Sequence, residues 1–308
     1  MNNVISTRVS VYRNLKDFKF SNKLTDEQKQ TIITTIKDAV KGKMLFSNIK
    51  EIDETNTQRL KNLGLVLENT KNIFIDKKEN LVINMFNVEH LAIISAMDMF
   101  NSKNVEKTIS FAQALADKVC FAYSDEYGFL MSDISKLGAG LKIESNIMLT
   151  AIKSINKIEQ VKQNLGKLGY ALNETKFPAV YTLSTQCNLG MGEKQICTDF
   201  ENTLLKLQEL ETESVKMLDM SKHDEIIDKT NRSEAVLNVA YMLNYDELYN
   251  ILVNLRLGIN LGVCNMKLED INKLQKLVIN KKTDYLSIDD MKTLAQEVKD
   301  VLKGEKDV

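Results

Sequence analysis

The hydrophobic pattern changes near Met220, and this change constrains the fold of the 308-residue chain more than any other feature. Before it, short apolar runs typical of strands alternate with amphipathic segments typical of helices. After it the strand pattern disappears, and the apolar spacing predicts helices over 232–240, 245–261, 268–279 and 287–302. The sequence therefore predicts two domains, 1–220 and 221–308, with the boundary in the polar stretch 221–231 and an all-helical second domain.

The first domain is expected to contain hairpins. The apolar runs at 73–75 and 81–86 flank the polar segment 76–80, which is the pattern of two antiparallel strands joined by a turn. Further strands are predicted at 4–12, 177–183 and on either side of a glycine-rich turn near 138–140, and helices at 25–40, 105–123, 152–168 and from 193 to about 218. We predict an α+β domain with a mainly antiparallel sheet flanked by helices, in preference to a doubly wound sheet.

Composition and charge exclude several classes of protein. Apolar residues make up 44% of the chain, and 41 basic side chains are balanced by 42 acidic ones, so no overall charge attracts nucleic acid or anionic lipid. The four cysteines, Cys120, Cys187, Cys197 and Cys264, are scattered and are accompanied by only two histidines. We therefore expect no metal site, no disulfide scaffold, no membrane segment and a cytoplasmic location.

The segment 137–141, Leu-Gly-Ala-Gly-Leu, is a candidate phosphate-binding turn. Glycine lets backbone N–H groups approach an anion closely and adopts positive φ angles without strain. A Gly-x-Gly sequence is by itself more typical of an ordinary tight turn. Its interpretation depends on the strand that follows, which begins with Leu141 and Lys142.

Five collinear stretches resemble motifs of the ATP:guanido phosphotransferase family, and the last resembles the helical tail of its bacterial protein arginine kinases. These stretches are 4–15, 84–92, 126–145, 183–193 and 255–262. The resemblance implies a guanido kinase catalytic domain, related in fold to glutamine synthetase, followed by a small helical domain. It also implies ATP and Mg²⁺ as reactants and transfer of the γ-phosphoryl group to a guanidinium nitrogen.

The resemblance implies five phosphate-binding arginines, and few of them are present in this chain. Arg8 matches the first of five, and Ser10, Ala92, Lys142 and Asn173 stand at the others. Lysine keeps the charge but lacks the two-pronged geometry with which arginine holds phosphate. Arg8 and Lys142 are thus the remaining candidate nucleotide-binding residues.

The catalytic glutamates implied by the family are also replaced. Asn87 and Val88 align with them, and Glu89 aligns with the aspartate that follows, which leaves Glu89 as the candidate base. The loop that would close over the guanidinium is shortened between Asn173 and Ser184.

These replacements predict a pseudokinase that works by protein binding or regulation. One well-placed arginine contributes roughly 10³- to 10⁵-fold to the rate of phosphoryl transfer, so losing several leaves little catalysis. The resemblance implies as partner an active kinase homologue or a stress-response regulator or protease component, in a homo- or heterodimer. Two alternatives remain: an active protein arginine kinase with Glu89, Glu126 or Glu174 as base, and a scaffold that binds neither nucleotide nor guanidinium.

Overall fold

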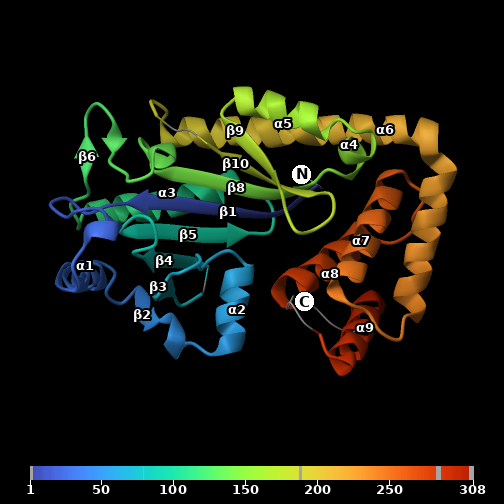
Figure 1. The fold of residues 1–308 in the computed structure, drawn as a ribbon, viewed down its shortest axis with the longest axis horizontal. Coiled ribbons are helices and arrows are strands. Elements are labelled where there is room, and N and C mark those ends of the chain that lie inside the picture. Colours follow the sequence, from blue (N-terminus) through green and yellow to red (C-terminus); the bar gives the residue numbers. More distant parts are fainter. Residues whose placement is uncertain (1–2, 79, 187–188, 282–285, 305–308) are drawn as a thin grey trace.

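The computed structural model describes residues 3–78, 80–186, 189–281 and 286–304, and is built around one eight-stranded sheet (Figure 1). The strand order is β2-β3-β4-β5-β1-β8-β10-β9, and every neighbouring pair is antiparallel. The strands are β1 (Val4–Arg13), β2 (Met44–Asn48), β3 (Asn72–Asp76), β4 (Leu81–Met85), β5 (Leu91–Met97), β8 (Leu141–Met148), β9 (Tyr170–Glu174) and β10 (Val180–Thr185), with a separate hairpin of β6 (Tyr123–Ser124) and β7 (Gly128–Phe129). The predicted α+β class and the hairpin at 73–86 are confirmed.

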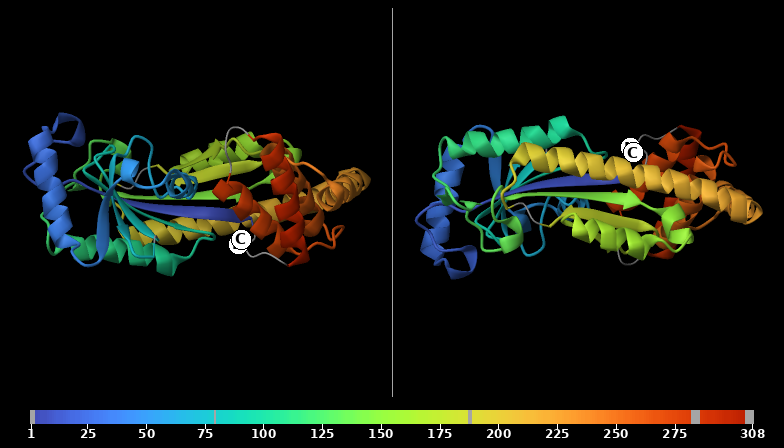
Figure 2. Two further views of the ribbon diagram at one scale, coloured as in Figure 1. Left: turned by 90° about the horizontal axis from the view of Figure 1, so that it is seen from below. Right: turned by 90° about the horizontal axis from the view of Figure 1, so that it is seen from above.

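The helices pack mainly on one face of the sheet and continue into a helical region at the C-terminal end (Figures 1 and 2). They are α1 (Asp26–Ala39), α2 (Glu54–Asn62), α3 (Ser102–Ala116), α4 (Thr150–Ser154), α5 (Ile158–Lys167), α6 (Glu193–Val239), α7 (Tyr245–Asn260), α8 (Leu268–Lys281) and α9 (Ile288–Lys303). The main core joins buried side chains of α1, α3, α5 and α6 to the sheet. Cys187 lies outside the described residues.

The two faces of the sheet differ in chemistry. Side chains alternate between the faces of a strand, and Val9 and Val11 of β1 lie in the core beneath the helices. Arg8 therefore lies on the opposite face. The same alternation on β8 places Lys142 and Glu144 on the Arg8 face, which α2 and the loop after it cover only in part. The polar centre of this face is the candidate functional site.

Helix α6 spans both regions of the molecule. It runs along the sheet, turns sharply and descends into the C-terminal helices (Figure 1). The turn is at Lys222, whose φ of −140° and ψ of 24° are not helical. The sequence predicted separate helices ending near 218 and starting at 232. The structure has one element, because residues 219–231, mostly exposed apart from the buried Ile226 and Thr230, continue the helix through a single kink.

The prediction of one continuous helix over 152–168 is wrong. The structure has two helices, α4 and α5, separated at Asn156, which has a φ of 58°. A residue in the left-handed region ends a helix, and asparagine tolerates that region better than most residues. The apolar spacing on either side stays in register, and it therefore hides the break.

The strand predicted over 177–183 begins later than expected. Pro178 and Ala179 belong to the turn between β9 and β10, where Ala179 has a φ of 58°, and β10 starts at Val180. The helix predicted over 105–123 likewise ends at Ala116. Both differences concern the ends of elements, where local propensity is weakest.

A close contact between α6 and α7 explains the glycine in the Arg-Leu-Gly sequence 256–258. A Cβ atom on Gly258 would lie 2.5 Å from both Cγ2 and Oγ1 of Thr230. Gly258→Ala is expected to destabilise the fold by about 1–3 kcal/mol, because the two helices cannot separate without losing other contacts. Urea unfolding of purified protein measures the change.

Two variants control for this prediction. Gly258→Ala combined with Thr230→Ala removes both clashing atoms and should recover most of the lost stability. Gly166→Ala in α5, where a Cβ would meet nothing within 4 Å, should leave the stability unchanged or raise it. A Gly258→Ala protein as stable as the unmodified chain would contradict the close contact.

Candidate functional site

Arg8 and Lys142 converge on one carboxylate, that of Glu144. In the β1–β8 register Arg8 lies directly opposite Glu144, and Lys142 lies opposite Ser10. Arg8 donates to Glu144 Oε2 through Nε, at 2.9 Å, and through Nη2. Lys142 Nζ lies 2.9 Å from Glu144 Oε1. Both oxygens of the carboxylate are therefore held by the two cations proposed to bind phosphate.

Glu144 is ionised in this position. Its side chain is 11% exposed, and burial acts to raise its pKa. The positive charges of Arg8 and Lys142, together with their hydrogen bonds, outweigh burial and lower the pKa below its usual value. Burial and the nearby Glu144 charge raise the pKa of Tyr12 to about 12, so this phenol stays neutral. Among the charged groups of Arg8, Lys142 and Glu144, the one negative charge offsets one of the two positive charges.

A hollow of about 1010 Å³ opens beside Arg8. Its walls include Lys61 from α2, Glu68 and Asn69 from the loop after α2, and Asn87 from the turn between β4 and β5. The loop crosses Arg8 closely at Gly64, where a Cβ would lie 3.3 Å from Arg8 Cδ. Most residues that line the hollow are polar, and the Arg8 side chain reaches it from β1.

Glu89 is buried and fully engaged by the surrounding chain. Its side chain accepts hydrogen bonds from Asn14 Nδ2 at 2.6 Å, from the Ser132 backbone N–H at 3.0 and 3.1 Å, from Ser132 Oγ at 2.8 Å and from the Asp133 N–H at 3.2 Å. The residue is 1% exposed. These contacts tie the turn before β5 to the end of β1 and to the loop before β8, which is a structural role. They leave no oxygen directed at the Arg8 hollow.

His90 is also part of this buried network. Its Nδ1 accepts from the Leu15 N–H at 3.0 Å, and its Nε2 bonds the Lys19 carbonyl oxygen at 2.7 Å. Since a carbonyl only accepts, Nε2 carries the proton and the ring is neutral, and burial also lowers the pKa of His90. Both ring nitrogens are used, which makes His90 a core histidine.

The positions aligned with the family's catalytic glutamates carry no acid. Asn87 Nδ2 donates to the Glu68 carbonyl oxygen, and Val88 is 44% exposed. The alternative bases lie elsewhere. Glu126 belongs to the β6–β7 hairpin and lines a different hollow, and Glu174 at the end of β9 lies 3.7 Å from Lys162 with its side chain 63% exposed.

The segment expected to close over a guanidinium is a tight turn. Only residues 175–179 separate β9 from β10, and the Thr175 N–H donates to the Val180 carbonyl oxygen at 3.1 Å. Asn173, aligned with a family arginine, pairs with Thr182 inside the β9–β10 ladder. The turn is too short to reach across the sheet face to Arg8, which lies two strands away.

In the described ranges, no group of three or more histidine, cysteine, aspartate or glutamate side chains is arranged to hold a metal ion. Among the same residues, no helix is both long and apolar enough to cross a bilayer.

Sequence reasoning did not single out Glu144. The signal was present, because Lys142 and Glu144 are two residues apart on a predicted strand and must therefore lie on one face. What the spacing could not show is that Arg8 lies directly opposite Glu144, since this pairing depends on the register of strands 136 residues apart in the chain.

Two family models match the chain. The model described as ATP:guanido phosphotransferase, C-terminal catalytic domain, matches residues 4–214. The model described as Protein-arginine kinase McsB C-terminal domain matches residues 223–306. Together they span the sheet region and the C-terminal helices.

Individual relatives that match most of the chain are named protein-arginine kinases. The protein-arginine kinase of Clostridium novyi (strain NT) is 27% identical over 332 residues, which cover 99% of this chain and 95% of that protein. The protein-arginine kinase of Halothermothrix orenii is 24% identical and covers 98% of this chain and 91% of that protein.

Solved structures show the same fold. The substrate-free duplicated taurocyamine kinase from Schistosoma mansoni matches 75% of this chain with a TM-score of 0.62 and 21% identity. The match spans only 37% of that longer chain. A lombricine kinase matches 68% of this chain and 66% of its own, with a TM-score of 0.60 and 16% identity.

Proposed function

The chain belongs to the ATP:guanido phosphotransferase family, and we propose that it is a protein-arginine-kinase-like pseudokinase that acts by binding another protein. One observation carries the proposal: Glu144 holds Arg8 and Lys142 in the place where the family resemblance puts the triphosphate. The carboxylate supplies internally the negative charge that a nucleotide would otherwise bring.

The residues present fit a Mg²⁺-triphosphate poorly. A phosphate that approached Arg8 and Lys142 would meet the ionised Glu144 between them, and the two negative charges would repel each other. Freeing the cations would require the Glu144 side chain, 11% exposed, to lose both partners at once. A buried carboxylate that loses its cationic partners costs several kcal/mol of stability. Binding of a nucleotide to one arginine and one lysine does not offset that cost.

The acid required for guanidinium phosphorylation is also missing. A base must approach the reacting nitrogen to hydrogen-bond distance. Asn87 and Val88 have no carboxyl group, and the Glu89 carboxylate is fixed by Asn14 and Ser132. The Arg8 hollow therefore offers no base to a substrate.

Retention of the family's fold over residues 4–214 and 223–306 without the catalytic groups supports a binding role. We propose as partner either an active kinase of the same family or a component of the stress-response machinery that such kinases regulate. We also propose that this partner and the chain form a homo- or heterodimer.

A working protein-arginine kinase is the second candidate. It is favoured by the hollow of about 1010 Å³ that remains beside Arg8, which leaves space for a ligand. In this alternative Glu144 moves away when nucleotide arrives, and Arg8 and Lys142 take the phosphates.

Thermal unfolding with and without Mg-ATP separates the two candidates. A ligand at 100 times its dissociation constant stabilises the folded state by about 2.7 kcal/mol, which raises the melting temperature measurably. We expect no increase with millimolar Mg-ATP, and no phosphoarginine after incubation with an arginine-rich protein. A phosphoarginine signal that disappears in Arg8→Ala would overturn the pseudokinase proposal.

A further inference from the structure

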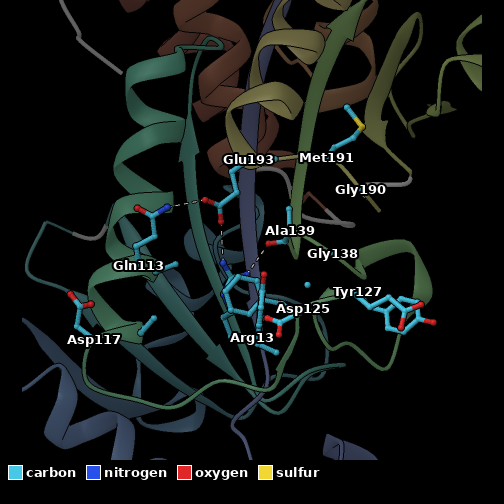
Figure 3. A pocket seen from close by; sticks show the side chains of 17 residues that line it. Arg13, Gln113, Asp117, Asp125, Tyr127, Gly138, Ala139, Gly190, Met191 and Glu193 are labelled. Atoms are coloured by element: carbon cyan, nitrogen blue, oxygen red, sulfur yellow. Dashed lines mark hydrogen bonds and ion pairs between the residues drawn. The ribbon is translucent and has the colours of Figure 1, made fainter.

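Helix α6 carries two carboxylates that hold it to the sheet region, and only the first has a cation beside it. At the start of the helix, Glu193 lies 3.1 Å from Arg13 Nη2 and accepts from Gln113 Nε2 at 2.9 Å (Figure 3). Further along, Glu211 is 2% exposed. In the described ranges no cation pairs with Glu211. Glu211 is therefore a buried acid without a compensating charge.

The Glu211 carboxylate links α6 to α4. Its Oε1 accepts from the Ala151 N–H at 2.7 Å, and its Oε2 accepts from the Ile152 N–H at 3.0 Å. Both N–H groups belong to the first turn of α4, where a helix offers them no partner of its own. The residue before α4 is Leu149, whose side chain cannot cap the helix. Glu211 thus supplies from α6 the cap that the sequence of α4 lacks.

This link lies at the joint between the sheet region and the C-terminal helices (Figure 1). Helix α4 follows β8 directly in the chain. Its buried Ala151 packs with Val215 and Leu218 of α6 and with Leu257 of α7 in one apolar cluster. Shortly after Leu218, α6 turns at Lys222 toward the C-terminal helices. The carboxylate therefore fixes α4 where α6 leaves the sheet.

The groups around Glu211 offer it no positive charge. Tyr181 of β10 faces it, and burial together with nearby acids, Glu211 among them, raises the pKa of Tyr181 and keeps the phenol neutral. Lys153, the one charged residue of α4, is exposed, and Arg256 of α7 bonds side chains of α8 instead. The charged side chains of β8 lie on the opposite face of the sheet. The charged neighbours on α6 itself are all exposed, and they are Lys206, Glu209, Glu213 and Lys216.

These surroundings favour the protonated acid. Burial raises the pKa of Glu211 to about 7, although the N–H groups of residues 150–152 act in the opposite direction. Gln208, three residues earlier on α6, lies on a neighbouring position of the helix surface. Its Oε1 is buried and has no donor among the described residues. Only the protonated form of Glu211 can donate a hydrogen bond to such an oxygen.

We propose that Glu211 is a proton-controlled link: protonation holds α4 against α6, and ionisation lets the joint between the sheet region and the C-terminal helices open more readily. In the closed form the carboxyl is buried and binds its proton tightly. In an open form water reaches the carboxyl, and its pKa returns to the usual 4.5. Protonation therefore stabilises the closed form fully below pH 4.5, and this stabilisation is lost as the pH rises to about 7. The inference does not depend on the loss of catalysis.

Native-state amide hydrogen exchange of the full-length protein measures the opening. The Ala151 and Ile152 N–H groups exchange with solvent only when their bonds to Glu211 break. After correction for the intrinsic exchange rate at each pH, we expect the opening constant to rise about tenfold between pH 6 and pH 8 and to level off above. Glu211→Gln keeps an acceptor oxygen but cannot ionise, so its opening constant should be the same at both pH values. Glu209→Gln, the same change at an exposed residue of α6, should keep the tenfold rise.

A carboxyl titration makes the test independent of how well the variants fold. In unmodified protein labelled with ¹³C at the glutamate side chains, one carboxyl signal should titrate near pH 7, and it should be absent from Glu211→Gln. The proposal is overturned if the corrected opening constant of the unmodified protein does not change with pH, if Glu211→Gln shows the same change, or if no glutamate signal titrates near pH 7. Binding of Mg-ATP would overturn the pseudokinase proposal and leave these outcomes unaffected, since the Arg8 hollow takes no part in them.

Discussion

Alanine in place of Glu144 is expected to give the protein an affinity for inorganic triphosphate that the unmodified chain lacks. The substitution removes the anion that Arg8 and Lys142 now share and leaves two cations side by side on neighbouring strands. Each charge-assisted hydrogen bond that they then make to phosphate contributes about 1.5–3 kcal/mol. Two such bonds predict triphosphate binding at least ~100-fold tighter than in the unmodified protein, measurable by isothermal titration calorimetry.

Two variants test whether this gain comes from the freed cations. Glu144→Ala combined with Arg8→Ala should lose most of the gained affinity, because only Lys142 remains. Glu174→Ala removes an exposed carboxylate beside Lys162 on the edge of the same sheet and should gain nothing. Equal triphosphate binding by the unmodified protein and by Glu144→Ala would show that Glu144 does not block the site.

The Glu144 variant should remain folded. Arg8 and Lys142 have side chains that are 32% and 30% exposed, so water can hydrate them once the carboxylate is gone. The melting temperature without ligand is expected to fall modestly. Adding triphosphate should restore it, because the anion replaces Glu144 as the partner of both cations.

Those elements of the fold that depend on neighbouring residues could be predicted from the sequence. The capping box of Thr25 and Gln28 opens α1, and Ser287 and Asp290 open α9 in the same way. The hairpin at 73–86 is likewise local. The continuity of α6 through the kink at Lys222 could not be predicted, because the stretch 221–231 has only two apolar residues, Ile226 and Ile227, which are too few to show a helical stripe.

The candidate site was predictable only in part for a related reason. The family resemblance placed Arg8 and Lys142 near the phosphate, and strand pairing brings them together. The role of Glu144 depends on the register between β1 and β8. A shift of one residue would turn Glu144 to the other face of the sheet, and spacing within one strand cannot exclude such a shift. The role of Glu144 therefore depends on contacts between distant segments, which local motifs do not specify.

Glu89→Ala is expected to destabilise the protein by about 3–5 kcal/mol, which would be the largest stability effect among these variants. The substitution leaves the backbone N–H groups of Ser132 and Asp133 without their acceptor and leaves Asn14 Nδ2 with only the Leu130 carbonyl oxygen, at 3.0 Å. It also opens a cavity where the Glu89 side chain, 1% exposed, now lies. Each unsatisfied buried donor costs about 1–3 kcal/mol. Chemical denaturation followed by circular dichroism measures the loss.

The size of this effect separates a structural glutamate from a catalytic one. A base directed at a substrate has few protein partners, so its removal leaves stability unchanged and acts on the reaction alone. Glu89→Gln sharpens the test, because the amide keeps the shape and one acceptor oxygen but brings an N–H₂ group against the donors of Ser132 and Asp133. It should therefore also destabilise, by less than alanine, whereas Glu174→Ala should not. If both Glu89 variants were as stable as the unmodified chain, the carboxylate would be free to act on a ligand, and the case for a working kinase would be reopened.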